Sequence, residues 1–149
     1  MKDTISIGRL GKLHPKIQPE VQKFIEDAES ALFVTIRISQ GTRTFEEQQA
    51  IYDQGRKTPG KIVTWSPPGA SYHNYGIAID VVVVNPDGTI NWNFDYHKLL
   101  PYMGKMTWGG VFPKPDMDHF ENKYGLNWRD LLHKYQIKDF IPGTEFVNI

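Results

Sequence analysis

Cysteine is absent from this chain of 149 residues, which excludes disulfide bonds, thiolate metal ligands and cysteine nucleophiles. Any metal ion must therefore be held by His, Asp or Glu. The chain also lacks an apolar run of about 18 residues, the length that a membrane-spanning helix requires. Its 17 basic and 17 acidic side chains balance, whereas a general nucleic-acid binder normally carries an excess of Lys and Arg. We therefore expect a globular protein that neither spans a membrane nor binds nucleic acid.

The pattern of apolar residues predicts a single α+β domain over residues 1–149. No long polar or low-complexity stretch marks off a second domain, and helices and strands do not alternate as regularly as in a parallel α/β fold. We expect a small, mostly antiparallel sheet flanked by helices. Residues 77–84 form its central strand, because this apolar run is interrupted only by Asp80. Further helices are expected at 19–31, 45–54, 96–105 and 127–135, and further strands at 33–39, 62–64, 108–112 and 119–121.

A lone carboxylate in the predicted central strand is the first sign of a functional site. Asp80 has aliphatic neighbours, and an ionised carboxylate in such surroundings is costly unless a cation or strong hydrogen bonds compensate its charge. His73 precedes it across a turn in which Gly76 and Ala78 leave little side-chain bulk, so the loop can bring His73 beside Asp80. A metal ion bound by both residues would compensate the carboxylate.

A second cluster, residues 108–121, offers a third ligand in His119. Two imidazole nitrogens and one carboxylate leave the fourth position of a tetrahedral zinc ion open for water, which is typical of catalytic zinc. Zinc lowers the pKa of that water to about 7. Asp116 could then serve as the general base, with a peptide carbonyl as the target. Asp118 flanks the same ligand and is the alternative base.

The two clusters resemble the signature of a known family. The residues that carry the resemblance are Ser71, His73, Gly76, Ala78, Asp80, Asp116 and His119. The zinc D-Ala-D-Ala carboxypeptidase and L-alanyl-D-glutamate endopeptidase family, which includes VanY-like peptidases and phage endolysins, reads Ser-x-His-x-x-Gly-x-Ala-x-Asp and then an acid three residues before a final His. The resemblance implies a hedgehog/DD-peptidase-like fold and one zinc ion per chain, held by His73, Asp80 and His119. It also implies that Asp116 activates the metal-bound water.

A third motif lies upstream, at the predicted entrance to the 45–54 helix. Residues 43–48, Arg-Thr-Phe-Glu-Glu-Gln, are similar to the Arg-Thr-x-x-Glu-Gln segment of the endopeptidase branch. In that family the arginine polarises the scissile carbonyl, and the resemblance assigns this role to Arg43. An alternative is a surface ion pair of Arg43 with Glu46 or Glu47. The branch with this segment, and with Trp-Gly-Gly before the last cluster, cuts between L-Ala and D-Glu.

Several further side chains have two possible roles. Glu121 either orients a ligand imidazole or is a charge at the end of a strand. Four aromatic residues either line the cleft or pack in the core: Tyr72, Tyr75, Trp65 and Trp108. The remaining histidines have no neighbouring ligands and are expected on the surface: His14, His97 and His133.

The expected function is hydrolysis of peptidoglycan stem peptides at the L-Ala–D-Glu bond by a monomeric zinc peptidase without a separate cell-wall-binding module. The alternatives are a D-Ala-D-Ala carboxypeptidase or dipeptidase, and a catalytically silent zinc-bearing module that binds the wall. Asp116 and Arg43 together favour the enzyme. The site of action would be the cell wall, in the periplasm or outside the cell. The opening residues lack the apolar stretch of a secretory signal. This leaves two routes to the wall: a leader that has been trimmed from the chain, or a stay in the cytoplasm until lysis, as for phage endolysins.

Overall fold

The computed structural model describes all 149 residues and contains a four-stranded sheet in the order β1-β2-β4-β3. Strand β2 (Ala78–Val84) pairs with β1 (Thr35–Gln40) on one side and with β4 (His119–Glu121) on the other. The edge strand β3 (Thr107–Trp108) pairs with β4. All three pairings are antiparallel, which confirms the predicted α+β class and the central place of the apolar strand.

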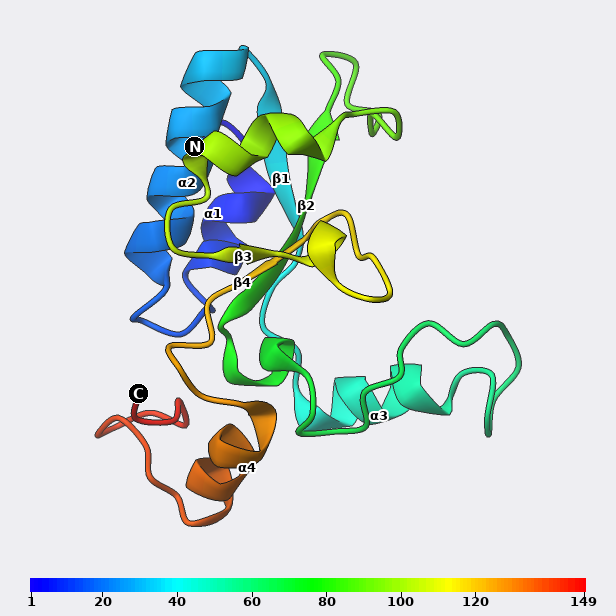
Figure 1. Ribbon diagram of the computed structural model, residues 1–149, viewed down its shortest axis with the longest axis vertical. Coiled ribbons are helices and arrows are strands. Elements are labelled where there is room, and N and C mark those ends of the chain that lie inside the picture. Colours follow the sequence, from blue (N-terminus) through cyan, green and yellow to red (C-terminus); the bar gives the residue numbers. More distant parts are fainter.

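Two helices pack against the sheet, and the other helices of the lower part of the molecule lie beyond one end of it (Figure 1). Helices α1 (Thr4–Leu10) and α2 (Gln18–Leu32) contact each other and β1, and they lie together on one side of the sheet (Figure 1). Helix α3 (Phe45–Asp53), the short 3-10 helix η1 (Tyr72–Tyr75) and α4 (Trp128–Gln136) gather at the end of the sheet away from α2 (Figure 1). No helix combines the length and apolar composition needed to cross a membrane.

The hydrophobic core lies between α2 and the sheet. The apolar residues of α2 recur at three-residue and four-residue spacing and are buried: Val21, Phe24, Ile25 and Ala28. This spacing places them on one face of the helix, which explains why the predicted 19–31 helix forms here. Phe24 packs against Phe120 of β4, with ring centroids 4.9 Å apart. The core thus holds β4, and with it His119, in a fixed position.

The predicted elements differ from the structure in four places. Residues 62–64 form no strand, and the strand expected at 108–112 ends at Trp108, where the 3-10 helix η3 (Gly109–Val111) begins. The helix expected at 96–105 is a 3-10 helix, η2 (Tyr96–Tyr102), because Pro101 supplies no N–H for a regular helix. Helix α1 was not predicted, and it begins at Asp3, whose side chain accepts a hydrogen bond from the Ser6 backbone N–H.

Gly76 makes the turn that joins η1 to β2. Its φ of +70° lies in the left-handed region, and its backbone N–H bonds back to the carbonyl of His73. A Cβ atom at this position would lie only 2.7 Å from the backbone nitrogen of His14. Glycine is therefore required both for the backbone conformation and for the close approach of the neighbouring chain.

We expect Gly76→Ala to destabilise the fold more than Gly125→Ala does. Gly125 has a similar φ of +76°, but a Cβ atom there would meet nothing within 4 Å. The left-handed conformation costs about 1–2 kcal/mol in either variant, and overpacking adds about 1–3 kcal/mol at Gly76 alone. Urea unfolding of the two variants measures the difference, and equal free energies of unfolding would contradict the steric argument.

Candidate metal centre

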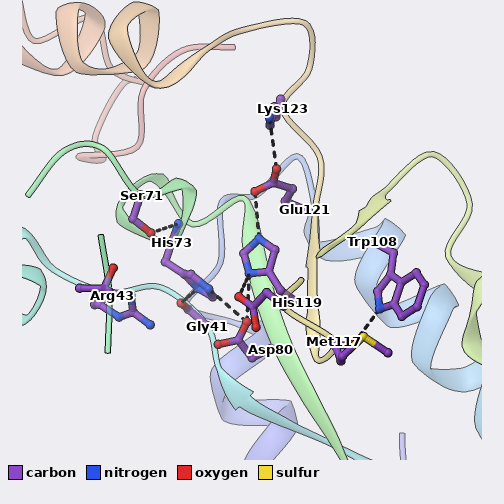
Figure 2. Close-up of polar contacts among 12 residues, drawn as sticks. Gly41, Arg43, Ser71, His73, Asp80, Trp108, Met117, His119, Glu121 and Lys123 are labelled. Atoms are coloured by element: carbon purple, nitrogen blue, oxygen red, sulfur yellow. Dashed lines mark hydrogen bonds and ion pairs between the residues drawn. The ribbon is translucent and has the colours of Figure 1, made fainter. Parts of the chain in front are cut away.

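Three elements bring His73, Asp80 and His119 together (Figure 2). His73 lies in η1, where its backbone N–H donates to the Ser71 hydroxyl oxygen that caps this short helix. Asp80 lies in β2 directly opposite His119 of β4, because these two residues are partners in the antiparallel register. The sequence therefore identified three side chains that the fold places side by side.

The ligand atoms converge on one oxygen of Asp80. The Nε2 atom of His73 lies 3.3 Å from Asp80 Oδ1, and the Nδ1 atom of His119 lies 3.0 Å from the same oxygen. One possible ligand atom from each residue lies within 4.8 Å of the other two. Both histidines are buried, and the Asp80 side chain is 18 % exposed. Such a compact set of nitrogen and oxygen atoms suits one metal ion.

Each imidazole uses its other nitrogen to contact a hydrogen-bond acceptor. His73 Nδ1 lies 2.8 Å from the carbonyl oxygen of Gly41, and His119 Nε2 lies 2.9 Å from Glu121 Oε2. A carbonyl oxygen accepts but cannot donate, so the proton of a neutral His73 resides on Nδ1 and the Nε2 lone pair faces Asp80. This donor set, two imidazole nitrogens and a carboxylate, fits a zinc ion.

Hydrogen bonds between the three side chains shift the pKa values of Asp80 and His119. Burial alone would raise the pKa of Asp80, but hydrogen bonds from His119 and His73 hold it well below the usual range. Burial likewise disfavours a charged His119, yet the hydrogen bonds to Asp80 and Glu121 outweigh it and raise the pKa of His119 to about 10. The Asp80 carboxylate therefore stays ionised and needs a cationic partner in this position.

Two further carboxyl groups border the centre. Asp116 Oδ2 lies 3.9 Å from His119 Nδ1, and the side chain is 56 % exposed. Asp118 is less exposed, and burial, a hydrogen bond with Asp116 and the negative charge of Asp80 raise its pKa to about 7. The indole N–H of Trp108 donates to the carbonyl of Met117, 2.7 Å away, and so fixes the loop between the two acids. Both candidate bases thus lie beside the predicted metal ligands.

Arg43 lines the same site and forms no surface ion pair. Its Nη1 atom donates to Gln48 Oε1 at 3.0 Å, and its backbone N–H donates to the carbonyl of His73. Burial lowers the pKa of the guanidinium, an effect that the nearby carboxylates of Asp80 and Glu47 oppose. The alternative that Arg43 pairs with Glu46 or Glu47 on the surface is therefore wrong.

The site lies in a cleft of about 850 Å³. One wall comes from the loop after α3, including Val63 and Ser66, and the other from the loop after β3, including Phe112 and Lys114. His73, Asp80 and His119 lie between these walls.

Three of the four aromatic residues take one of the two roles considered, and Trp65 takes neither. Tyr72 lines the cleft, whereas Tyr75 and Trp108 belong to the hydrophobic core. Trp65 is 64 % exposed, and Lys114 of the opposite wall lies over its ring, 4.1 Å from the centroid. This contact connects the two walls of the cleft.

The prediction that His14 lies on the surface is wrong. It is 1 % exposed, and its Nε2 atom lies 2.8 Å from the carbonyl of Val147. The reason is a long-range contact, since Phe146 and Val147 of the carboxyl-terminal segment fold back against His14, and no local pattern in the sequence predicts this contact. His97 and His133 are exposed, as expected.

Sequence reasoning overlooked Gln48, which organises one side of the site. Gln48 is fully buried, accepts from Arg43 and donates through Nε2 to the carbonyl of Ser66 at 2.7 Å. It links α3 to the cleft wall and holds Arg43 in place. A polar residue on the inward face of a helix was the signal that could have identified it.

Comparisons with known proteins agree with this geometry. The chain is 39% identical over 135 residues to the peptidoglycan L-alanyl-D-glutamate endopeptidase CwlK of Bacillus subtilis, covering 91% of this chain and 74% of CwlK. The crystal structure of the L-Ala D-Glu endopeptidase ChiX of Serratia marcescens superposes with a TM-score of 0.57 and 25% identity, over 85% of this chain and 90% of ChiX.

A second solved structure shares the fold. The D,D-pentapeptidase VanY in complex with Zn(II) superposes with a TM-score of 0.52 at 19% identity, over 81% of this chain and 78% of that one. Residues 11–115, which include His73 and Asp80, match the family described as VanY, D-alanyl-D-alanine carboxypeptidase. The chain therefore belongs to the VanY family of peptidases.

Proposed function

We propose that this protein is a monomeric zinc peptidase that acts at the cell wall and hydrolyses the L-alanyl–D-glutamate bond of peptidoglycan stem peptides. The observation that carries the proposal is the convergence of His73 Nε2, Asp80 Oδ1 and His119 Nδ1 in a cleft that Arg43 and Asp116 also line. The names of CwlK and ChiX support the choice of bond, because both relatives are endopeptidases for L-Ala–D-Glu.

His73, Asp80 and His119 hold one zinc ion per chain in this proposal. When bound, zinc polarises the scissile carbonyl and lowers the pKa of water to about 7, so that hydroxide is available at neutral pH. Three protein ligands leave a coordination position for water or substrate. Asp80 contributes the negative charge that two neutral imidazoles lack.

Asp116 is the general base. Its carboxylate lies close to His119 Nδ1, the nitrogen that faces the centre, and it is exposed to an incoming peptide. Asp116 takes a proton from the attacking water and then gives it to the nitrogen of the leaving D-Glu residue. Asp118 is not the base in this proposal, although one of its carboxyl oxygens lies within 4.8 Å of an oxygen of Asp116.

Arg43 stabilises the oxyanion that forms on the scissile carbonyl. One of its N–H groups is engaged by Gln48, which leaves donors of the guanidinium for the substrate. A guanidinium held in place in a cleft needs little reorganisation when negative charge develops on the carbonyl oxygen. The role depends on Gln48, since an unanchored arginine would sample several rotamers.

Chelation should abolish hydrolysis of a defined stem peptide, and zinc should restore it. The peptide L-Ala-D-Glu-meso-diaminopimelate-D-Ala-D-Ala is incubated with the protein, and the products are identified by mass spectrometry. We expect free L-Ala and a tetrapeptide that begins with D-Glu. Release of D-Ala alone would indicate a carboxypeptidase, and tight binding of the wall without any product would indicate a silent module. Hydrolysis that persists in the chelator would contradict a zinc mechanism.

Replacement of Asp116 by Asn should lower kcat by about 10²–10⁴-fold, the usual contribution of a general base, while zinc remains bound at one ion per chain. Asp118→Asn is the matched control, because this variant removes a carboxyl group two residues away from the base. We expect it to lose less than about tenfold in kcat. Steady-state kinetics combined with metal analysis of both variants makes the comparison. A larger loss of activity in Asp118→Asn would exchange the two roles, and loss of zinc from Asp116→Asn would make Asp116 a ligand.

A further inference from the structure

Glu121 is a buried carboxylate next to the candidate metal centre to which the proposed mechanism assigns no role. Its side chain is 2 % exposed, and it follows His119 by two residues in β4, so both side chains point to the same face of the sheet. Its Oε2 atom lies 2.9 Å from His119 Nε2 (Figure 2). A buried carboxylate is costly, so this contact calls for a physical explanation.

A metal ion binds His119 only in its neutral form, in which one proton resides on either nitrogen, and only one of these two forms suits the metal ion. If a neutral imidazole carries its proton on Nδ1, that proton is donated to Asp80 and no lone pair faces the centre. If the proton is on Nε2, it is donated to Glu121, and the Nδ1 lone pair is free. Asp80 and Glu121 are both acceptors for this ring. When a metal ion binds Asp80, Glu121 is the acceptor that remains for the proton, which favours the second arrangement.

We infer that Glu121 is a positioning residue that holds the His119 ring with its proton on Nε2 and its Nδ1 lone pair directed at the zinc ion. This inference rests on the metal centre proposed above. Gly41 performs the equivalent task for His73 through a backbone carbonyl. A carboxylate is the stronger acceptor, and it also increases the basicity of the ring nitrogen that binds the metal.

Lys123, which lines the cleft, forms an ion pair with Glu121. Its Nζ atom lies 3.4 Å from the other carboxylate oxygen of Glu121 (Figure 2). The same atom lies over the Tyr72 ring, 4.8 Å from the centroid. The ammonium group balances the charge of Glu121 and occupies the oxygen that His119 does not use. Glu121 is therefore held from both sides, which limits the rotation of its carboxylate.

The experiment measures zinc affinity instead of peptidase activity. Dissociation constants are obtained by competition with a chromophoric chelator for the wild type, Glu121→Ala and Glu121→Gln. Loss of a side chain that orients a ligand weakens metal binding by about 10–100-fold, and we expect the larger value for Ala. Gln should lie near the smaller value, because its amide can donate as well as accept and no longer dictates the position of the proton.

Glu29→Gln is the matched control. Glu29 is also almost fully buried, at 3 % exposed, but it accepts a hydrogen bond from the backbone N–H of Ile36, away from the centre. We expect this variant to lower the free energy of unfolding without changing zinc affinity. A role of Glu121 in stability alone would give the same result for Glu121→Gln as for the control.

The nitrogen-15 NMR spectrum of the zinc-loaded protein reports the tautomer directly. We expect His119 to carry its proton on Nε2 in the wild type, with that signal weakened or exchanging in both Glu121 variants. Wild-type zinc affinity and an unchanged tautomer in Glu121→Gln would overturn the inference, even if Glu121→Ala does not fold. A wild-type protein that binds no zinc would instead overturn the proposed function itself.

Discussion

The partly buried carboxylate of Asp80 is the constraint around which the site is built. It lies in the central strand, between two imidazole nitrogens at 3.0 and 3.3 Å, and its ionised form is tolerated only because these partners compensate it. The antiparallel register sets His119 opposite Asp80, while the turn at Gly76 returns His73 to the same point. A change in either element would leave a negative charge without a partner inside the sheet.

Around this centre, the side chains of the proposed mechanism are held in place by other residues of the fold. Gln48 anchors Arg43, the Trp108 indole fixes the loop between Asp116 and Asp118, and the Gly41 carbonyl orients His73. Most of these contacts join segments that are far apart in the chain. Precise placement of a few side chains is what such chemistry requires, and a rigid sheet with anchored loops provides it.

Motifs and periodicity were sufficient for the candidate ligands and for most of the elements. The apolar spacing of α2 and the apolar run of β2 are local patterns, and each forms the expected element. Helix α3 likewise begins after Thr44, whose side chain accepts a hydrogen bond from the Glu47 N–H. The predictions were wrong where the local sequence pattern favours one structure and contacts with distant residues impose another. Residues 62–64 have strand-like side chains but find no neighbouring strand, and His14 has no local sign of the carboxyl-terminal segment that buries it.

By itself, the sequence determined which residue types can bind a metal ion here, because the absence of cysteine and the spacing of His73, Asp80 and His119 are properties of the chain. Only the tertiary structure decided which nitrogen of each imidazole faces Asp80, how Gln48 holds Arg43, and that Glu121 contacts His119 instead of solvent. The physical reason is that orientation depends on hydrogen-bond partners brought together by strand pairing and loop packing, and a one-dimensional pattern does not specify those partners.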